Sequence, residues 1–137
     1  MSAIELHIPI RRDVLLTANQ RLHWRRKAER TKSIRTIAHV LALAEGGSKP
    51  FPGRVHLTVS IAWPDARRRD AGNLHPTLKA CVDGIADAGW LEDDSDRYLV
   101  GPDLRVSDER CSKDYACKLT FTFEPVLVDM YARSADA

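Results

Sequence analysis

Hydrophobic and polar residues alternate along three stretches of the chain, and this pattern predicts three β-strands. Residues 4–10 have apolar side chains at every second position, and Pro9, which has no N–H to donate, places this strand at a sheet edge or ends it. Residues 55–63 alternate most clearly, and residues 115–123 follow the same pattern. A weaker pattern over residues 98–106 predicts a short, interrupted fourth strand.

Two further stretches repeat their apolar residues at the spacing of an α-helix. The first helix is expected over residues 24–45, ended by Gly46, with Trp24 packed in the core and basic side chains on the outer faces. Its apolar stripe consists of Trp24, Ala28, Thr31, Ile34, Ala38 and Leu41. The second helix is expected from Pro76, which suits a first helical turn, to Gly89.

The order of these elements is β-α-β-α-β-β, which indicates an α/β protein with one mixed sheet covered by two helices. A chain of 137 residues, 44% of them hydrophobic, has room for one core. We therefore expect a single domain over residues 1–125. The tail over residues 126–137, rich in Ala, Asp and Ser, is expected to be frayed.

Composition excludes several classes of protein. No apolar run approaches the ~20 residues that cross a bilayer, and the N-terminus has no hydrophobic signal-peptide region, so we expect a cytoplasmic protein with no membrane partner. Three cysteines are too few for a disulfide scaffold, and their count is odd. We expect Cys81, Cys111 and Cys117 to be buried or half-buried thiols.

The net charge of +2 hides a strong asymmetry along the chain. Residues 11–35 include nine basic and two acidic residues, whereas residues 83–109 include nine acidic and two basic residues. The basic segment suits a polyanion, and the acidic segment suits a divalent cation. Alternatively, the two segments neutralise each other as solvated faces.

Candidate chemistry lies after the central predicted strand. Asp70 follows that strand, and Asp93 and Asp94 precede the next one, so these carboxylates would converge at one sheet edge if the two strands are neighbours. Hard cations such as Mg²⁺ prefer carboxylate and water oxygens. Lys79 would then neutralise charge on a phosphoryl group, and Asp83, four residues later on the same helix face, would orient it.

Each of these residues also has an ordinary structural role. Asp70 would serve as a turn residue or helix cap, and Asp93-Asp94 as a solvated turn. Lys79 and Asp83 would form a surface ion pair at helical spacing. The run Arg67-Arg68-Arg69 is either an exposed loop or a phosphate clamp.

Five short motifs occur in order over residues 19–123. They are Asn19, Arg21, His23, Trp24 and Arg26 near the start, then Arg68-Arg69-Asp70-x-x-Asn73-Leu74, Lys79-x-x-x-Asp83, Ala88-Gly89 and Asp93-Asp94. As a set they resemble the RusA-type Holliday-junction resolvases, and the resemblance covers most of the chain. It implies an α/β fold and a homodimer that uses Mg²⁺ or Mn²⁺ to nick four-way DNA junctions in two strands of like polarity, with no small-molecule substrate. Such enzymes act in DNA recombination and repair, largely in bacteriophages and prophages, so the resemblance implies a bacterium or a phage-infected host.

The resemblance also assigns roles to single residues. Asp70 and Asp94 would be catalytic metal ligands, with Asp93 as the adjacent alternative, and Lys79 would be the essential basic residue. Asn73 would steady its loop through hydrogen bonds. His23 is expected to hydrogen-bond near the phosphates rather than to bind metal. Trp24 is expected to lie in the core, with a base-stacking platform as the alternative. The residues that would face DNA are Asn19, Arg21, His23, Arg26, Arg67, Arg68 and Arg69.

The chain departs from the family pattern in one loop. The family has Asp-x-Asp-Asn, whereas Gly72 stands here in place of the second aspartate, and three extra residues precede Lys79. Loss of a carboxylate weakens neutralisation of the cation, although His75, Glu92 or Asp93 could substitute for it. The sequence thus predicts a metal-dependent junction endonuclease, with a relative that binds branched DNA without cutting it as the alternative. A third interpretation is that the basic helix binds RNA or a protein partner.

Overall fold

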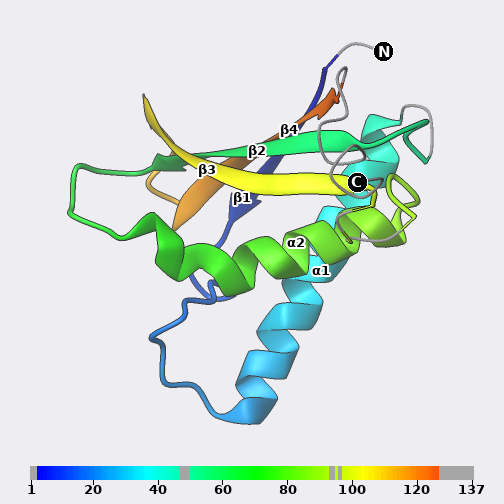
Figure 1. The fold of residues 1–137 in the computed structure, drawn as a ribbon. Helices are drawn as coiled ribbons and strands as arrows, with labels where there is room; N and C mark the ends of the chain where they lie inside the picture. Colours follow the sequence, from blue (N-terminus) through cyan, green and yellow to red (C-terminus); the bar gives the residue numbers. More distant parts are fainter. Residues whose placement is uncertain (1–2, 47–49, 93–94, 96, 127–137) are drawn as a thin grey trace, which may run out of the picture.

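A computed structural model describes residues 3–46, 50–92, 95 and 97–126. Four strands and two α-helices form one layered structure, and a short 3₁₀ helix, η1, precedes the second α-helix (Figure 1). In chain order the elements are β1 (Ile4–Ile10), α1 (Trp24–Glu45), β2 (Val55–Trp63), η1 (Ala71–Leu74), α2 (His75–Asp87), β3 (Leu99–Arg110) and β4 (Cys117–Pro125). This order is the predicted one, and the predicted class of a mixed sheet with two helices is confirmed.

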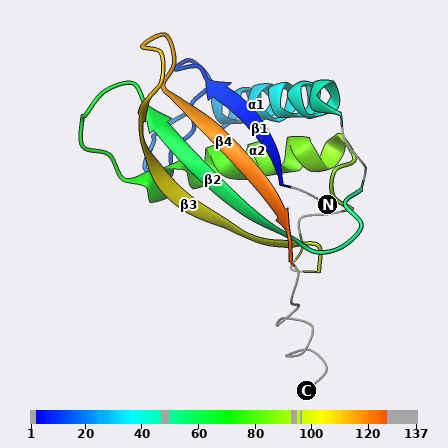
Figure 2. The ribbon, with the colours of Figure 1, turned by 90° about the horizontal axis from the view of Figure 1, so that it is seen from above.

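The sheet has the strand order β1-β4-β2-β3. The β4 strand pairs antiparallel with both β1 and β2, whereas β2 and β3 are parallel and are joined through α2. Figure 2 shows both helices on the same side of the sheet. The β1 strand lies at an edge, as Pro9 predicts, because an edge strand needs no hydrogen bond from that position.

The core lies between the sheet and the helices. Alternate residues of β1, β2 and β4 are fully buried, which is why these strands alternate so clearly in the sequence. Phe51, Trp90 and Phe123 form an aromatic cluster with ring centroids 5.4–5.8 Å apart. The Trp90 indole Nε1 donates a hydrogen bond to the Ala42 carbonyl, 3.2 Å away, and so ties the segment that follows α2 to α1.

The two halves of α1 have different surroundings. Ile34, Ala38 and Ala42 are buried, but no residue before Ile34 in this helix is, and Figure 1 shows this first half projecting beyond α2. The expectation that Trp24 packs in the core is wrong, since 68% of this residue is exposed. The reason is length: a helix of 22 residues is about 33 Å long, more than α2 and the sheet cover.

Some element boundaries differ from the predicted ones. The β3 strand spans twelve residues rather than the short stretch expected, because it pairs with β2 along its length with two register shifts. As an edge strand with mostly exposed side chains, it has only a weak hydrophobic pattern. The β4 strand begins at Cys117 rather than at residue 115, since Tyr115 donates its N–H to Ser112 in the preceding turn. Most of the predicted tail lies outside the described residues.

The cysteines are free thiols, as expected. Cys81 and Cys117 are buried and Cys111 is half-buried. Among the described residues, none of the helices is long and apolar enough to cross a membrane.

Candidate functional site

Asp70 stands at the start of η1 and caps it. One carboxylate oxygen, Oδ1, accepts a hydrogen bond of 3.0 Å from the Gly72 N–H, and the side chain is exposed. The predicted role as a helix cap is therefore confirmed. The second carboxylate oxygen has no hydrogen bond to any described residue, so the cap leaves it available to a ligand.

Backbone contacts anchor the loop before α1 to the start of α2. The Ala18 N–H donates to the Asn73 carbonyl at 2.9 Å, and the buried Thr77 hydroxyl both accepts from the Leu16 N–H and donates to the Leu16 carbonyl. The Asn73 amide side chain has no hydrogen bond to a described residue, so this residue steadies the loop through its backbone instead. Sequence reasoning missed Thr77, whose only signal was a polar residue on the apolar helix face.

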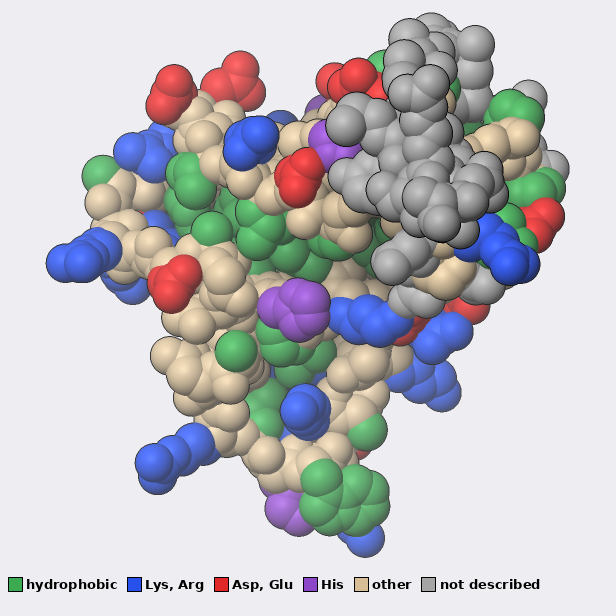
Figure 3. Space-filling model, in the orientation of Figure 1, with side chains coloured by type: hydrophobic (Ala, Val, Ile, Leu, Met, Phe, Trp, Pro, Cys, Tyr) green, Lys and Arg blue, Asp and Glu red, His purple; other side chains and the backbone are tan. Residues whose placement is uncertain are grey.

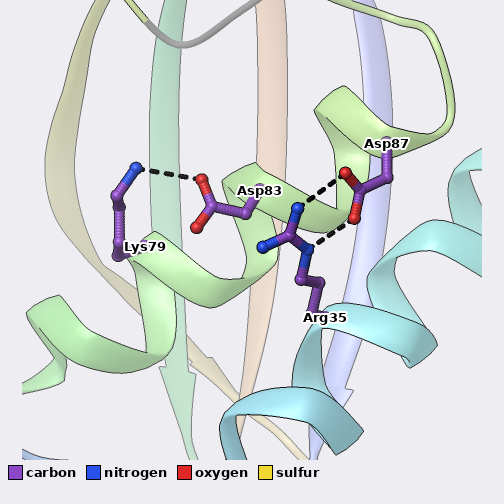
Figure 4. A network of polar contacts seen from close by, with 4 residues as sticks. All are labelled: Arg35, Lys79, Asp83 and Asp87. Atoms are coloured by element: carbon purple, nitrogen blue, oxygen red, sulfur yellow. Dashed lines mark hydrogen bonds and ion pairs between the residues drawn. The ribbon is translucent and has the colours of Figure 1, made fainter.

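Lys79 and Asp83 form the predicted ion pair on α2, with 2.9 Å between Nζ and Oδ1. Figure 4 shows the Asp83 carboxylate between Lys79 and Arg35, which reaches over from α1 to Asp87. Two hydrogen bonds of 2.5 and 2.8 Å join the Arg35 guanidinium to the Asp87 carboxylate. They raise the pKa of Arg35 and lower the pKa of Asp87. This network fixes Lys79 on the exposed side of α2.

A hollow of about 180 Å³ lies between α2 and the start of β3. His75 and Lys79 supply its polar groups, whereas Leu78, Val82, Leu99, Gly101 and Pro102 form the rest of its wall. Lys79 therefore borders a recess as well as open solvent.

The three arginines after β2 do not act alike. The Arg69 side chain is 19% exposed, lies 4.7 Å from the centre of the Trp63 ring and forms an ion pair of 2.8 Å with Asp65. This pair, helped by the Arg67 N–H, lowers the pKa of Asp65 to about 2. Arg67 and Arg68 are exposed, and their guanidinium groups form no hydrogen bond or ion pair with a described residue. Arg67 and Arg68 can therefore still bind a phosphate, whereas the Arg69 guanidinium is already bound within the loop.

The basic segment over residues 11–35 divides in the same way. Arg11 pairs with Asp13, Arg30 donates to the Leu15 carbonyl at 2.8 Å, and Arg35 binds Asp87. The other cations are exposed and form no ion pair with a carboxylate of the described residues. They are Arg12, Arg21, Arg25, Arg26, Lys27 and Lys32.

In the part of the chain that the structure describes, the basic and acidic segments neutralise each other through a single contact. Within the described residues, Arg35–Asp87 is the only ion pair that joins them. In Figure 3 the lower projection carries blue, purple and green side chains, whereas most of the red side chains lie on the upper part of this face. Most of the basic segment therefore stays available to an external anion.

His23 caps the start of α1. Its Nδ1 accepts a hydrogen bond of 3.2 Å from the Arg25 N–H, and its ring stacks on Trp24 with 5.6 Å between the centroids. His23 is thus a hydrogen-bonding residue at the tip of the projecting helix, beside the exposed Asn19 and Arg21. The predicted DNA-facing residues of the N-terminal motif lie together at this tip and in the loop that leads to it.

The predicted convergence of Asp70 with the second acidic motif does not follow from the topology. The β2 and β3 strands are neighbours, but they run parallel. The last residue of β2 and the first residue of β3 therefore lie at opposite ends of this pair of strands. Asp93 and Asp94 lie outside the described residues. Ser95, which accepts hydrogen bonds from the N–H groups of Tyr98 and Leu99, lies at the start of β3, whereas Asp70 follows the end of β2.

The donor set at Asp70 is small. The described residues contain no group of three or more His, Cys, Asp or Glu side chains placed to hold a metal ion. One carboxylate with a free oxygen is the minimum that Mg²⁺ uses, because this ion keeps several waters and often takes only one or two protein carboxylates. The Asp70 carboxylate before η1 therefore offers at most a weak site for a hard cation, which a bound phosphate would help to retain.

Comparisons with known proteins leave the family open. No protein-family model matches the chain. A curated protein of Xylella fastidiosa, described there as an uncharacterized protein, is 36% identical over 81 residues. The match covers 57% of this chain and 53% of that protein, so the chain spans about half the length of the relative it matches.

Proposed function

We propose that this protein is a metal-dependent, structure-selective DNA endonuclease that resolves four-way junctions by paired nicks. The observation that carries the proposal is the arrangement at one end of the molecule. An exposed carboxylate with a free oxygen, Asp70, and an oriented lysine, Lys79, belong to the start of the same helical segment. Unpaired arginines stand on the preceding loop and on the projecting helix.

Each side chain has a defined task in this proposal. Arg67 and Arg68 bind phosphates of the strand to be cut, and Arg21 and Arg26 bind the adjoining arm. Lys79 donates to a non-bridging phosphoryl oxygen as negative charge develops there, and its pairing with Asp83 limits the rotamers it must give up. These contacts position the backbone before any bond is broken.

Mg²⁺ or Mn²⁺ would bind at the Asp70 carboxylate, with waters and a phosphate oxygen of the bound DNA as its other ligands. Such an ion supplies charge neutralisation and a bound water of lowered pKa. A homodimer fits the task, because a four-way junction offers two related strands and each needs its own site.

The second candidate is a protein that binds branched DNA without cutting it. Gly72 favours this function, since a Cβ at this position would lie 3.3 Å from the Asp70 carboxylate oxygen. The missing carboxylate would therefore stand beside Asp70, and its absence removes half of a two-carboxylate site.

Cleavage of a labelled synthetic four-way junction tests the proposal, with Mg²⁺, Mn²⁺ or EDTA present. The variant is Asp70→Asn, because an asparagine side-chain oxygen still accepts the Gly72 N–H and keeps the cap. Asp108→Asn, at an exposed position of β3, is the matched control. We expect paired nicks that need metal, disappear in Asp70→Asn and persist in the control. Tight binding with no nicks under any metal would favour the non-cutting binder, and no binding at all would refute both functions.

A further inference from the structure

Trp24 is exposed in a way that the other tryptophans are not. It is 68% exposed in the first turn of α1, whereas Trp63 and Trp90 are 9% and 1% exposed. A large aromatic surface left in water costs free energy that folding alone does not explain, so exposed aromatic groups often mark a binding surface. Trp24 also lies on the half of α1 that supports no core.

Cationic and aromatic neighbours hold the Trp24 ring without burying it. The His23 ring stacks against it at an angle of 30°, and the Arg25 guanidinium lies 5.2 Å from its centroid. Because His23 also caps the helix through Arg25, its own position is fixed. These two contacts restrict the ring, and the 68% exposure of Trp24 leaves aromatic surface open to a ligand.

An open hollow of about 530 Å³ runs from Trp24 along one face of α1. Its lining residues follow helical spacing and are Trp24, Lys27, Ala28, Thr31, Lys32 and Arg35. From Trp24 to Arg35 the helix rises by about 16 Å, and at Arg35 the hollow reaches the Asp87 ion pair on α2. Small side chains form its middle, and the Lys27 and Lys32 ammonium groups have no carboxylate partner among the described residues.

The charge of this surface selects its occupant. Residues 24–35 contain six basic residues and one acidic residue, Glu29, and the first turn of α1 carries no acidic side chain. An apolar protein partner would leave these cations unpaired, whereas a nucleic acid strand offers a phosphate for each cation and a base for the ring. Unpaired bases are required, because paired bases in a duplex are already stacked on each other.

We propose that Trp24 is a stacking platform for an unpaired nucleobase, with Lys27 and Lys32 binding the phosphates of the same strand along α1. This inference rests on the proposed function, from which it takes DNA as the ligand. It adds that the projecting half of α1 binds the unpaired bases of a branch point. One strand would then run from the tip of α1 towards the Lys79–Asp83 pair.

Tryptophan fluorescence tests the inference, because Trp24 is the one tryptophan that solvent reaches freely. Titration with short oligothymidylate is expected to quench the emission of the wild-type protein and to leave that of Trp24→Ala unchanged. Loss of one stacked base should weaken binding about 5- to 150-fold in Trp24→Ala. Trp24→Phe should keep most of the affinity, because any aromatic face stacks.

Leu43→Ala is the matched control, since Leu43 is a second exposed apolar residue of α1 away from the hollow. Its oligothymidylate affinity should equal that of wild type. Unchanged affinity in Trp24→Ala would overturn the inference, and so would a change of oligomeric state in that variant with no change in DNA binding, which would point to a second copy on this surface. Circular dichroism should show the same fold in every variant, because the substituted side chains are exposed.

Junction cleavage by the wild-type protein separates this inference from the proposed function. Quenching that depends on Trp24, together with a junction that is never nicked, would support the stacking platform and refute the endonuclease. Metal-dependent nicking that is identical in wild type and Trp24→Ala, with equal affinities for oligothymidylate, would support the endonuclease and refute the stacking platform.

Discussion

Arg69 is held by the loop that carries it. Its guanidinium contacts the Asp65 carboxylate, the Arg67 carbonyl and the face of Trp63, so three of its neighbours in sequence fix its position. Arg67 and Arg68 next to it have no such contacts. A run of identical residues therefore divides into one that shapes the loop and two that are left to bind a ligand, and only the fold distinguishes them.

The Asp65–Arg69 pair makes part of the stability depend on pH. The pKa of Asp65 is lowered to about 2, chiefly by the Arg69 hydrogen bond, so the pair contributes stability above about pH 4 and loses it as the pH falls towards 2. NMR titration of the carboxyl groups should place Asp65 near 2 in wild type and closer to its ordinary value in Arg69→Ala. Arg68→Ala is the control and should leave the pKa of Asp65 unchanged. An ordinary pKa in the wild-type protein would contradict this account.

Gly72 is the position where a carboxylate introduced by substitution should strengthen metal binding at Asp70. The backbone there does not need glycine, and a Cβ would meet only the movable end of the Asp70 side chain, at 3.3 Å. If the proposed function is right, Gly72→Asp should lower the Mg²⁺ concentration needed for half-maximal junction cleavage by about tenfold, a gain of about 1.4 kcal/mol. Gly72→Ala supplies the same Cβ without the charge. Equal responses of the two variants would mean that the carboxylate has no part in metal binding.

At the scale of elements, the sequence predicts best those strands and helices that bury one face and expose the other. The β1, β2 and β4 strands alternate because each packs one face on the helices, and the Lys79–Asp83 pair follows from helical spacing alone. The β3 strand was predicted too short because an edge strand buries little. The exposed half of α1 was misjudged because small residues at helical spacing suit a core and a surface equally.

The packing of α1 on α2 depends on one glycine. A Cβ at Gly84 would lie 2.3 Å from the Arg35 carbonyl oxygen and 2.8 Å from the Ala38 Cβ, so the helices would have to separate. Alanine favours a helix over glycine by about 1 kcal/mol, yet overpacking costs about 1–3 kcal/mol, and we expect Gly84→Ala to lower the free energy of unfolding. Urea unfolding measures the change. Gly53→Ala, where a Cβ meets nothing within 4 Å, should be neutral, and equal stability of the two variants would show that the helices are not in close contact there.

At the scale of the whole molecule, pairing inside the fold decides which charges remain for a partner. Arg30 and Arg35 have partners 15 and 52 residues away in the sequence, so no local pattern could identify them as structural. The same limit applies to the candidate site. Because β2 and β3 are neighbours, the sequence predicts that Asp70 and the second acidic motif converge. The parallel direction of these strands, which the sequence does not show, places the end of β2 and the start of β3 far apart along the strands.

The unpaired cations should set how steeply DNA binding depends on salt. Each phosphate contact releases counterions, so removing one contact lowers the slope of log K against log salt by about one. Arg26→Ala and Arg67→Ala each remove an exposed cation without a partner among the described residues, and we expect both to reduce the slope for a four-way junction. Arg97→Ala, near the start of β3 in the acidic segment, should not. If all three variants lowered the slope equally, net charge alone would account for binding, and the position of the cations around Asp70 and α1 would not matter.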